Sequence, residues 1–218
     1  MITSIIMSKG GVGKSMMSLN LAVAAADKGA RVLLIDTDVQ GSTATAFETR
    51  KNLAEVDNSA IPFKEVNFMH VTDSSVFNIL TQAPAEYDQI FVDTQGADTA
   101  FIWKIANASD LVVVPVAAGM ADVNAVAEVA TKLMYYKDQG ADFRSYSIRT
   151  NHRENTRLVA TITANLAFFK DSLPMLNISM RNRAIYAEAF SYGAGVLEYA
   201  PKTEAAGEIR KLYKELYA

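Results

Sequence analysis

A glycine-rich loop close to the start of the chain constrains the fold more than any other feature. Residues 8–15 read Ser-Lys-Gly-Gly-Val-Gly-Lys-Ser, after the apolar run 2–7 and before an amphipathic helical pattern over 14–28. Glycines allow backbone N–H groups to converge on an anion, and a helix N-terminus also attracts negative charge. This strand–loop–helix order is typical of a phosphate-binding loop. We expect Lys14 to contact phosphate oxygens and the Ser15 hydroxyl to bind Mg²⁺.

Short apolar runs alternate with helical patterns along the whole chain. Strong strand-like runs lie at 2–7, 32–36, 89–93 and 111–116, and weaker ones lie near 66–71, 145–149 and 173–178. Continuous apolar runs of this kind are typical of strands that are buried on both faces of a parallel sheet. The alternation predicts the α/β class, with one doubly wound, mostly parallel sheet flanked by helices. We expect residues 1–218 to form a single phosphate-loop domain.

Acidic residues follow two of the predicted strands. Asp36 ends the run 32–36, Asp38 comes two residues later, and Asp93 ends the run 89–93. The carboxyl ends of parallel strands meet at one edge of a sheet, where such folds bind their ligands. Carboxylates placed around a phosphate loop indicate a site for a metal ion and a nucleotide.

The details of the loop resemble one family of ATPases. Because residue 8 is Ser, the strict pattern G-x-x-x-x-G-K-[ST] is not met, and a second lysine, Lys9, stands beside it. The run from Lys9 to Ser15 resembles the deviant Walker A motif of the ParA/MinD family, in which the first lysine reaches the partner's ATP in a nucleotide-sandwich dimer. Segment 36–42 resembles the family's next motif, except that Val39 replaces a usual proline and leaves the backbone φ less fixed. Segment 89–96 resembles Walker B followed by switch II.

The resemblance implies ATP and Mg²⁺ as ligands and assigns roles to individual residues. The catalytic residues it implies are Lys9, Lys14 and Asp38, the last acting on the attacking water. The nucleotide contacts it implies are Lys9, Gly10, Gly11, Val12, Gly13, Lys14, Ser15 and Met16. The Mg²⁺ site it implies uses Ser15, Asp36 and Asp93. We add Asn151, just after the predicted strand 145–149, as a candidate contact to the base; a loop asparagine that only makes a turn is an equal alternative.

The resemblance extends over most of the chain and implies a function. Segments 109–116 and 205–216 are similar to a strand and to the final helix of short plasmid-type ParA proteins. A member of that group is a slow ATPase that forms an ATP-dependent homodimer or a higher polymer and binds DNA without sequence preference. A centromere-binding adaptor of the ParB/ParG type stimulates its hydrolysis. We therefore expect a cytoplasmic protein that associates with the nucleoid in its ATP form.

The distribution of charge bears on DNA binding. The chain carries 21 Lys+Arg and 24 Asp+Glu, a formal charge of −3, but its basic residues are concentrated toward the C-terminus. A locally basic surface can attract a polyanion despite a negative total. Arg183 matches an arginine in a late segment of the family and is the first candidate for DNA contact, followed by Arg181 and Lys211. Ordinary solvated helix faces are the alternative explanation of these residues.

Composition excludes several rival functions and leaves others open. The absence of cysteine excludes a disulfide scaffold, a thiolate zinc site and a cysteine-bound iron–sulfur cluster. A MinD-like membrane-associated ATPase would need a strongly basic amphipathic tail. The C-terminal stripe is flanked by mixed charges, so we expect this helix to pack on its own domain without stable membrane association. A conjugation-associated ParA-like ATPase, a tyrosine kinase of related fold and an amide ligase of the same superfamily stay open. The apolar stripe consists of Ile209, Leu212, Tyr213, Leu216 and Tyr217.

Overall fold

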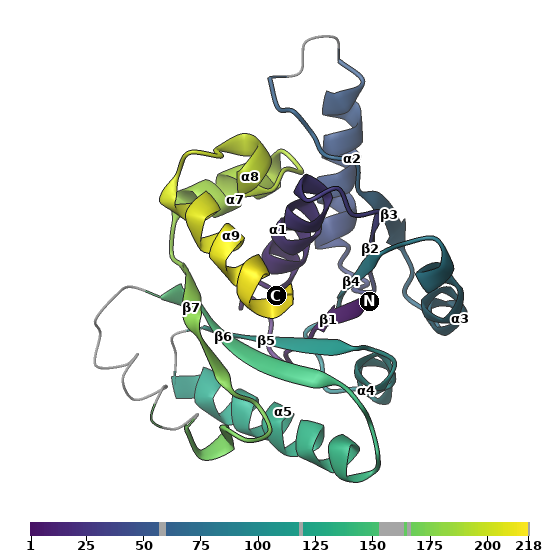
Figure 1. Cartoon of the computed structure of the whole chain (residues 1–218), viewed down its shortest axis with the longest axis vertical. Helices are drawn as coiled ribbons and strands as arrows, with labels where there is room; N and C mark the ends of the chain where they lie inside the picture. The colour runs from purple at the N-terminus through teal and green to yellow at the C-terminus, as the bar shows by residue number, and fades with distance from the viewer. Residues whose placement is uncertain (57–59, 118–119, 153–163, 165–166, 218) are drawn as a thin grey trace.

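The computed structural model describes residues 1–217 except 57–59, 118–119, 153–163 and 165–166. Its strands form one seven-stranded sheet in the order β3-β2-β4-β1-β5-β6-β7, and each pairing is parallel (Figure 1). This arrangement confirms the predicted fold class. The strands are β1 Ile2–Ile5, β2 Val32–Asp36, β3 Asn67–His70, β4 Gln89–Asp93, β5 Leu111–Ala117, β6 Arg144–His152 and β7 Met175–Arg181.

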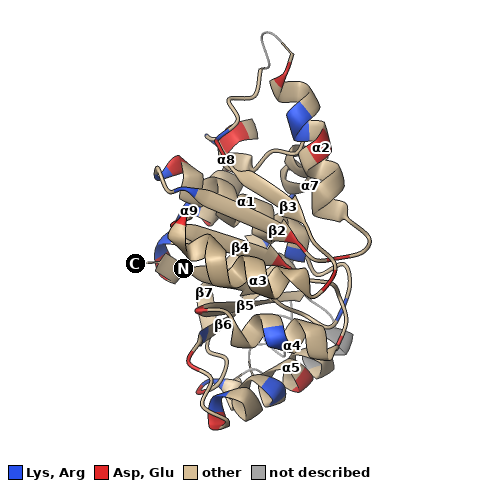
Figure 2. Ribbon diagram, turned by 90° about the vertical axis from the view of Figure 1, so that its right-hand side faces the viewer, with Lys and Arg blue, Asp and Glu red and all other residues tan. Residues whose placement is uncertain are grey.

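Helices cover both faces of the sheet (Figures 1 and 2). Helices α1, α7, α8 and α9 share one core cluster with the sheet, while α3, α4 and α5 pack on the opposite face. Helix α2 contributes Phe47 to the first cluster. The helices are α1 Lys14–Asp27, α2 Ser42–Ala54, α3 Ser75–Gln82, α4 Ala100–Asn107, α5 Met120–Asp138, α7 Ala184–Ser191, α8 Val196–Tyr199 and α9 Glu204–Tyr217, with short 3₁₀ turns η1 Ala83–Ala85 and η2 Ala167–Phe169.

The residues of β2 show why a continuous apolar run forms a central strand. All five of its residues are buried. Val32 and Leu34 belong to the cluster on the α1 side, whereas Leu33 and Ile35 belong to the cluster on the α3 side. Successive side chains of a strand point to opposite faces, so a strand covered on both faces needs apolar residues at consecutive positions.

The C-terminal helix packs on its own domain, as its apolar stripe predicts. Ile209, Leu212 and Leu216 are fully buried in the cluster that also contains α1. Two tyrosines on the same stripe hydrogen bond to the sheet: Tyr213 Oη lies 2.6 Å from Gln89 Nε2, and Tyr217 Oη lies 2.8 Å from Thr3 Oγ1. Among the helices of the described residues, none is both long and apolar enough to cross a membrane.

Candidate functional site

The phosphate loop is shaped by two glycines in the left-handed region of backbone space. Gly11 has a φ of +76° and Gly13 a φ of +92°, values that residues with a Cβ rarely adopt. A Cβ placed on Gly10, Gly11 or Gly13 would meet no atom within 4 Å, so open space lies beside the loop backbone. The Val12 carbonyl accepts a 2.7 Å hydrogen bond from Thr150 Oγ1 at the end of β6. The loop is therefore open on the side where a ligand would bind, and it is tied to β6 through the hydrogen bond at Val12.

Lys14 begins helix α1 and lies across the loop. Its side chain is buried, and its Nζ donates to the Lys9 carbonyl over 3.1 Å. Burial lowers the pKa of Lys14, and the nearby carboxylates of Asp93 and Asp38 act in the opposite direction. A cation at this place faces the space that the glycines leave open, which is where an anionic ligand of the loop would lie.

The two acidic strand ends lie next to each other. Asp36 and Asp93 are register partners across β2 and β4, and Asp93 also pairs with Ile5, the last residue of β1 before the loop. Burial and the neighbouring Asp36 raise the pKa of Asp93 to about 7, although the hydroxyls of Ser15 and Thr43 lower it. The sheet thus places Asp93 beside the strand that carries the phosphate loop and Asp36 one strand further away.

The chemistry of Asp93 fits a divalent cation. Its Oδ2 accepts a 2.7 Å hydrogen bond from Thr43 Oγ1, whereas its Oδ1 is buried without a hydrogen-bond partner. A buried carboxylate oxygen without a partner is costly unless a cation or a donor compensates it. No group of three or more acidic or histidine side chains suited to a metal occurs among the described residues. Mg²⁺ needs only one or two carboxylates when phosphates and water complete its shell.

The Asp36 carboxylate organises the loop that follows β2. Its Oδ1 accepts from the Asp38 N–H over 2.9 Å, and its Oδ2 accepts from the Ala44 N–H over 3.0 Å. Burial raises the pKa of Asp36, while these two hydrogen bonds lower it. Both oxygens are thus already bonded to the backbone, so a contact from Asp36 to a metal ion through a water molecule fits better than a direct bond.

The segment after β4 lies directly against the loop. Thr94 Oγ1 donates to the Ile5 carbonyl over 2.7 Å. A Cβ on Gly96 would lie 3.0 Å from the Gly10 nitrogen and 3.1 Å from Lys14 Nζ. A side chain at position 96 would therefore crowd the loop backbone, and the segment that resembles switch II contacts the phosphate loop and its lysine.

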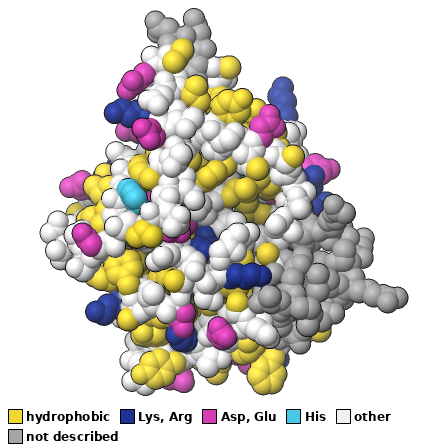
Figure 3. All heavy atoms as spheres, turned by 180° about the vertical axis from the view of Figure 1, so that it is seen from behind, with side chains coloured by type: hydrophobic (Ala, Val, Ile, Leu, Met, Phe, Trp, Pro, Cys, Tyr) yellow, Lys and Arg dark blue, Asp and Glu magenta, His cyan; other side chains and the backbone are white. Residues whose placement is uncertain are grey.

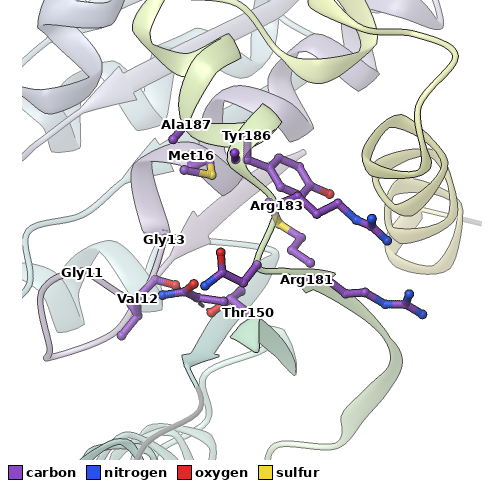
Figure 4. A pocket seen from close by; sticks show the side chains of 13 residues that line it. Gly11, Val12, Gly13, Met16, Thr150, Arg181, Arg183, Tyr186 and Ala187 are labelled. Carbon is purple, nitrogen blue, oxygen red and sulfur yellow. Dashed lines mark hydrogen bonds between the residues drawn. The ribbon is translucent and has the colours of Figure 1, made fainter. Parts of the chain in front are cut away.

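A cavity of about 200 Å³ opens beside the loop and contains the predicted base contact (Figure 4). Met16 of α1 and Asn151 of β6 both line it, and Asn151 has a φ of +48°, a conformation that asparagine tolerates better than most residues. Residues 180–184, 186 and 187 also line it, and they include Arg181 and Arg183. The two arginines predicted for DNA contact therefore also border this cavity.

The side chain of Arg183 is paired with helix α9. Its guanidinium lies 2.6 Å from Glu204 and 2.9 Å from Glu208, and these contacts raise its pKa. Tyr186 Oη also donates to Glu208 over 2.9 Å. Lys211, the third candidate, is exposed on α9. The sequence did not reveal the two glutamate partners of Arg183, since they are separated from it by more than one helix along the chain.

Sequence patterns also missed the polar residues that hold the site together. Thr43 donates a hydrogen bond to Asp93, and Thr150 donates one to the Val12 carbonyl of the loop. An isolated threonine belongs to no recognisable sequence motif. Gly41, which has a left-handed backbone conformation, lies two residues before Thr43 and directly precedes α2. This glycine is the local sequence signal that marks the start of α2.

Comparison with known proteins identifies a family for this arrangement. Residues 3–196 match the CobQ/CobB/MinD/ParA nucleotide binding domain. The maintenance of carboxysome distribution protein A of Gloeobacter kilaueensis is 26% identical, over 99% of this chain and 93% of that protein. The chromosome-partitioning ATPase Soj of Thermus thermophilus is also 26% identical, over 96% and 92%.

Solved structures show the same fold. Apo McdA of Cyanothece superimposes with a TM-score of 0.75 at 18% identity, over 100% of this chain and 99% of that one. A plasmid partition protein of Borrelia burgdorferi B31 bound to AMPPNP gives 0.70 at 22% identity, over 99% and 97%. With the matched domain covering the phosphate loop and both acidic strand ends, the chain belongs to the CobQ/CobB/MinD/ParA family of nucleotide-binding domains.

Proposed function

We propose that this protein is a ParA-like ATPase that hydrolyses ATP slowly in the presence of Mg²⁺ and positions a DNA or other cargo. The observation that carries the proposal is the buried Lys14, whose Nζ lies at the phosphate loop and donates to the Lys9 carbonyl. The carboxylates of Asp93 and Asp38 are near enough to raise the pKa of Lys14, so in our proposal the three groups surround one ligand.

Each group has a role that its surroundings support. The loop N–H groups and Lys14 bind the β- and γ-phosphates, with Lys9 to Met16 forming the cradle. Ser15 and Asp93 hold Mg²⁺, Asp36 contacts it through water, and the ion neutralises charge on the phosphate oxygens when bound. The Asp38 carboxylate orients the attacking water. Asn151 and the cavity beside the loop take the base.

A homodimer would complete the site. Lys9 directly precedes the loop glycines and, in our proposal, reaches the phosphates of a second copy. Two nucleotides that face each other repel unless cations intervene, so ATP-dependent pairing and the extra lysine belong together. A polymer would need a second, heterologous contact between dimers that does not close on itself.

The proposed cargo carrier binds DNA without sequence preference and releases it after hydrolysis. Arg183, Arg181 and Lys211 are the proposed contacts, and a ParB/ParG-type adaptor stimulates turnover. On the face in Figure 3, basic side chains stand singly among acidic and apolar ones. The proposed basic contacts of a single copy are few, and pairing would double them. We therefore propose that the protein is cytoplasmic and associates with the nucleoid in its ATP form.

The structure bears on the rival MinD-like function. A lipid-binding helix needs an apolar face that is free to enter a membrane, but that face of α9 is buried against the sheet and α1. We therefore propose no stable membrane association. Sedimentation with anionic liposomes and ATP distinguishes the two functions, and a conjugation-associated role would share the ATP chemistry with a different adaptor.

Calorimetry with ATP and Mg²⁺ tests the nucleotide site. Lys14→Ala should bind ATP far more weakly than the wild type, because it removes the buried cation from the loop. Lys28→Ala, which changes an exposed lysine beyond the other end of α1, should bind normally. Wild-type affinity in Lys14→Ala would refute the assignment.

A further inference from the structure

Hydrogen bonds hold both backbone polar groups of Asp38 and one of its carboxylate oxygens. Its N–H donates to Asp36 Oδ1 over 2.9 Å, and its own Oδ1 accepts from the Gln40 N–H over 2.9 Å. Its carbonyl oxygen accepts from the Gly41 N–H over 2.9 Å and lies 2.9 Å from His70 Nε2. Of these contacts, the histidine is the one that comes from outside the loop 36–41.

His70 reaches this carbonyl from the neighbouring strand. It is the last residue of β3 and the register partner of Asp36, and the Val71 N–H donates to the Asp36 carbonyl over 2.9 Å. The strand pairing therefore fixes where the imidazole projects. A carbonyl oxygen only accepts hydrogen bonds, so Nε2 of His70 carries the proton in this contact.

The ring also packs against the far end of the loop. A Cβ built on Gly41 would lie 3.4 Å from His70 Cε1, and Gly41 has a φ of +62°, which glycine adopts without strain. The imidazole thus contacts both ends of the turn from Asp38 to Gly41. Between them, Val39 is 61% exposed, and its φ lacks the covalent restriction that a proline would impose.

We propose that His70 is a positioning residue for ATP hydrolysis. Its Nε2–H fixes the carbonyl of Asp38, and this contact restrains a turn that has no proline, so that the Asp38 carboxylate keeps its direction toward the attacking water. The proposal rests on the proposed ATPase function. Because misplacing a catalytic group reduces the rate without weakening ground-state binding, His70 should influence turnover and not ATP affinity.

The test compares three substitutions at His70. His70→Leu keeps the bulk but removes the donor, and should lower the single-turnover rate of ATP hydrolysis about tenfold, the fold-change that one hydrogen bond of ordinary strength supplies. In His70→Gln the amide nitrogen reaches about as far from the backbone as Nε2 does, so this variant should restore most of the rate. His70→Asn also carries an amide, but its shorter side chain should not restore the rate.

Two further measurements separate positioning from other effects. ATP affinity by calorimetry should be the same in all variants. Amide hydrogen exchange of Gln40 and Gly41 in the nucleotide-free protein should be faster in His70→Leu and His70→Asn than in the wild type and His70→Gln. Unchanged exchange and unchanged turnover in His70→Leu would overturn the role of His70. A wild type that hydrolyses no ATP would overturn the proposed function instead, and the exchange rates would still decide whether His70 orders the loop.

Discussion

The guanidinium of Arg50 and the carboxylate of Glu198 form an ion pair inside the protein, where the side chains are only 7% and 0% exposed. Two hydrogen bonds of 2.7 and 2.8 Å join them. The pair connects α2, which begins at the end of the Asp38 loop, with α8, which follows the helix that borders the cavity. Arg50 also donates to the Gly193 carbonyl over 2.9 Å, and Glu198 accepts from the Gly195 N–H over 2.9 Å.

Removing one member of this pair should destabilise the fold strongly. Glu198→Leu leaves the Arg50 charge buried without an opposite charge, a change that costs about 3–5 kcal/mol of the free energy of unfolding. The double variant Arg50→Met/Glu198→Leu should recover a large part of the loss, because no charge is left buried. Urea unfolding followed by circular dichroism measures both.

The exposed pair Arg31–Asp88 is the matched control, since its side chains are 62% and 49% exposed. Asp88→Ala should change the unfolding midpoint little. A double variant at Arg50 and Glu198 that is no more stable than Glu198→Leu would mean that the backbone contacts, and not the uncompensated charge, account for the loss.

The metal-free protein should lose stability as the pH rises. The pKa of Asp93 is raised from 3.8 to about 7 in the folded state, so between these values the folded protein holds a proton that the unfolded chain has lost. Stability then falls with rising pH across this window and levels off above it. The melting temperature in EDTA, measured from pH 4 to 8, should show this slope in the wild type and a weaker one in Asp93→Asn. An equal slope in both would assign the effect to other groups.

The strands and the phosphate loop followed from local sequence, because they depend on neighbours in the chain. The β2 and β4 boundaries agree with the predicted runs 32–36 and 89–93. The predicted run 2–7 was too long: β1 ends at Ile5, since Ile6 and Met7 are apolar and buried but already lead into the loop. Apolar character predicts burial there and does not mark the end of strand pairing.

The contacts that hold the site could not be predicted, because they join residues that are distant in sequence. Arg50 and Glu198 are 148 positions apart, and Val12 and Thr150 are 138 apart. The first pair depends on how helices pack on the sheet and the second on the order of the strands within it. No local pattern encodes either. Arg183 shows the consequence: its match to an arginine of the family predicted DNA contact, but its ion pairs with Glu204 and Glu208 appear only in the folded chain.

Asp38→Ala should separate hydrolysis from binding. A carboxylate that orients or activates the attacking water contributes roughly 10²- to 10⁴-fold to the rate, so turnover should fall by an amount in that range. ATP binding and ATP-dependent pairing should persist, because the loop and Lys14 are unchanged. A variant that keeps its adaptor-stimulated rate would move the role to another group, with Asp36 the next candidate.

Lys9→Ala should separate pairing from binding. If Lys9 acts on the ATP of a second copy, one copy should bind ATP normally, whereas light scattering with ATP and Mg²⁺ should find only monomers. Lys28→Ala again serves as the control, because it removes one positive charge far from the loop. Pairing of Lys9→Ala at wild-type strength would exclude a role for this lysine across the interface.

The charge on α9 leads to a prediction about DNA. Arg183 is already paired with two carboxylates, while Lys211 is exposed, so Lys211→Ala should weaken binding at least as much as Arg183→Ala. If the ATP-bound dimer contacts about four phosphates, log K against log[salt] should slope at about −3.6, and losing one contact per copy should reduce the slope to about −1.8.

Fluorescence anisotropy with two unrelated duplexes of equal length, in ATP and in ADP, measures this slope. The two duplexes should bind with equal affinity. Lys104→Ala changes an exposed lysine of α4 on the opposite face of the sheet and should keep the wild-type slope. Binding that is absent in ATP even at low salt would mean that DNA contact belongs to a partner protein.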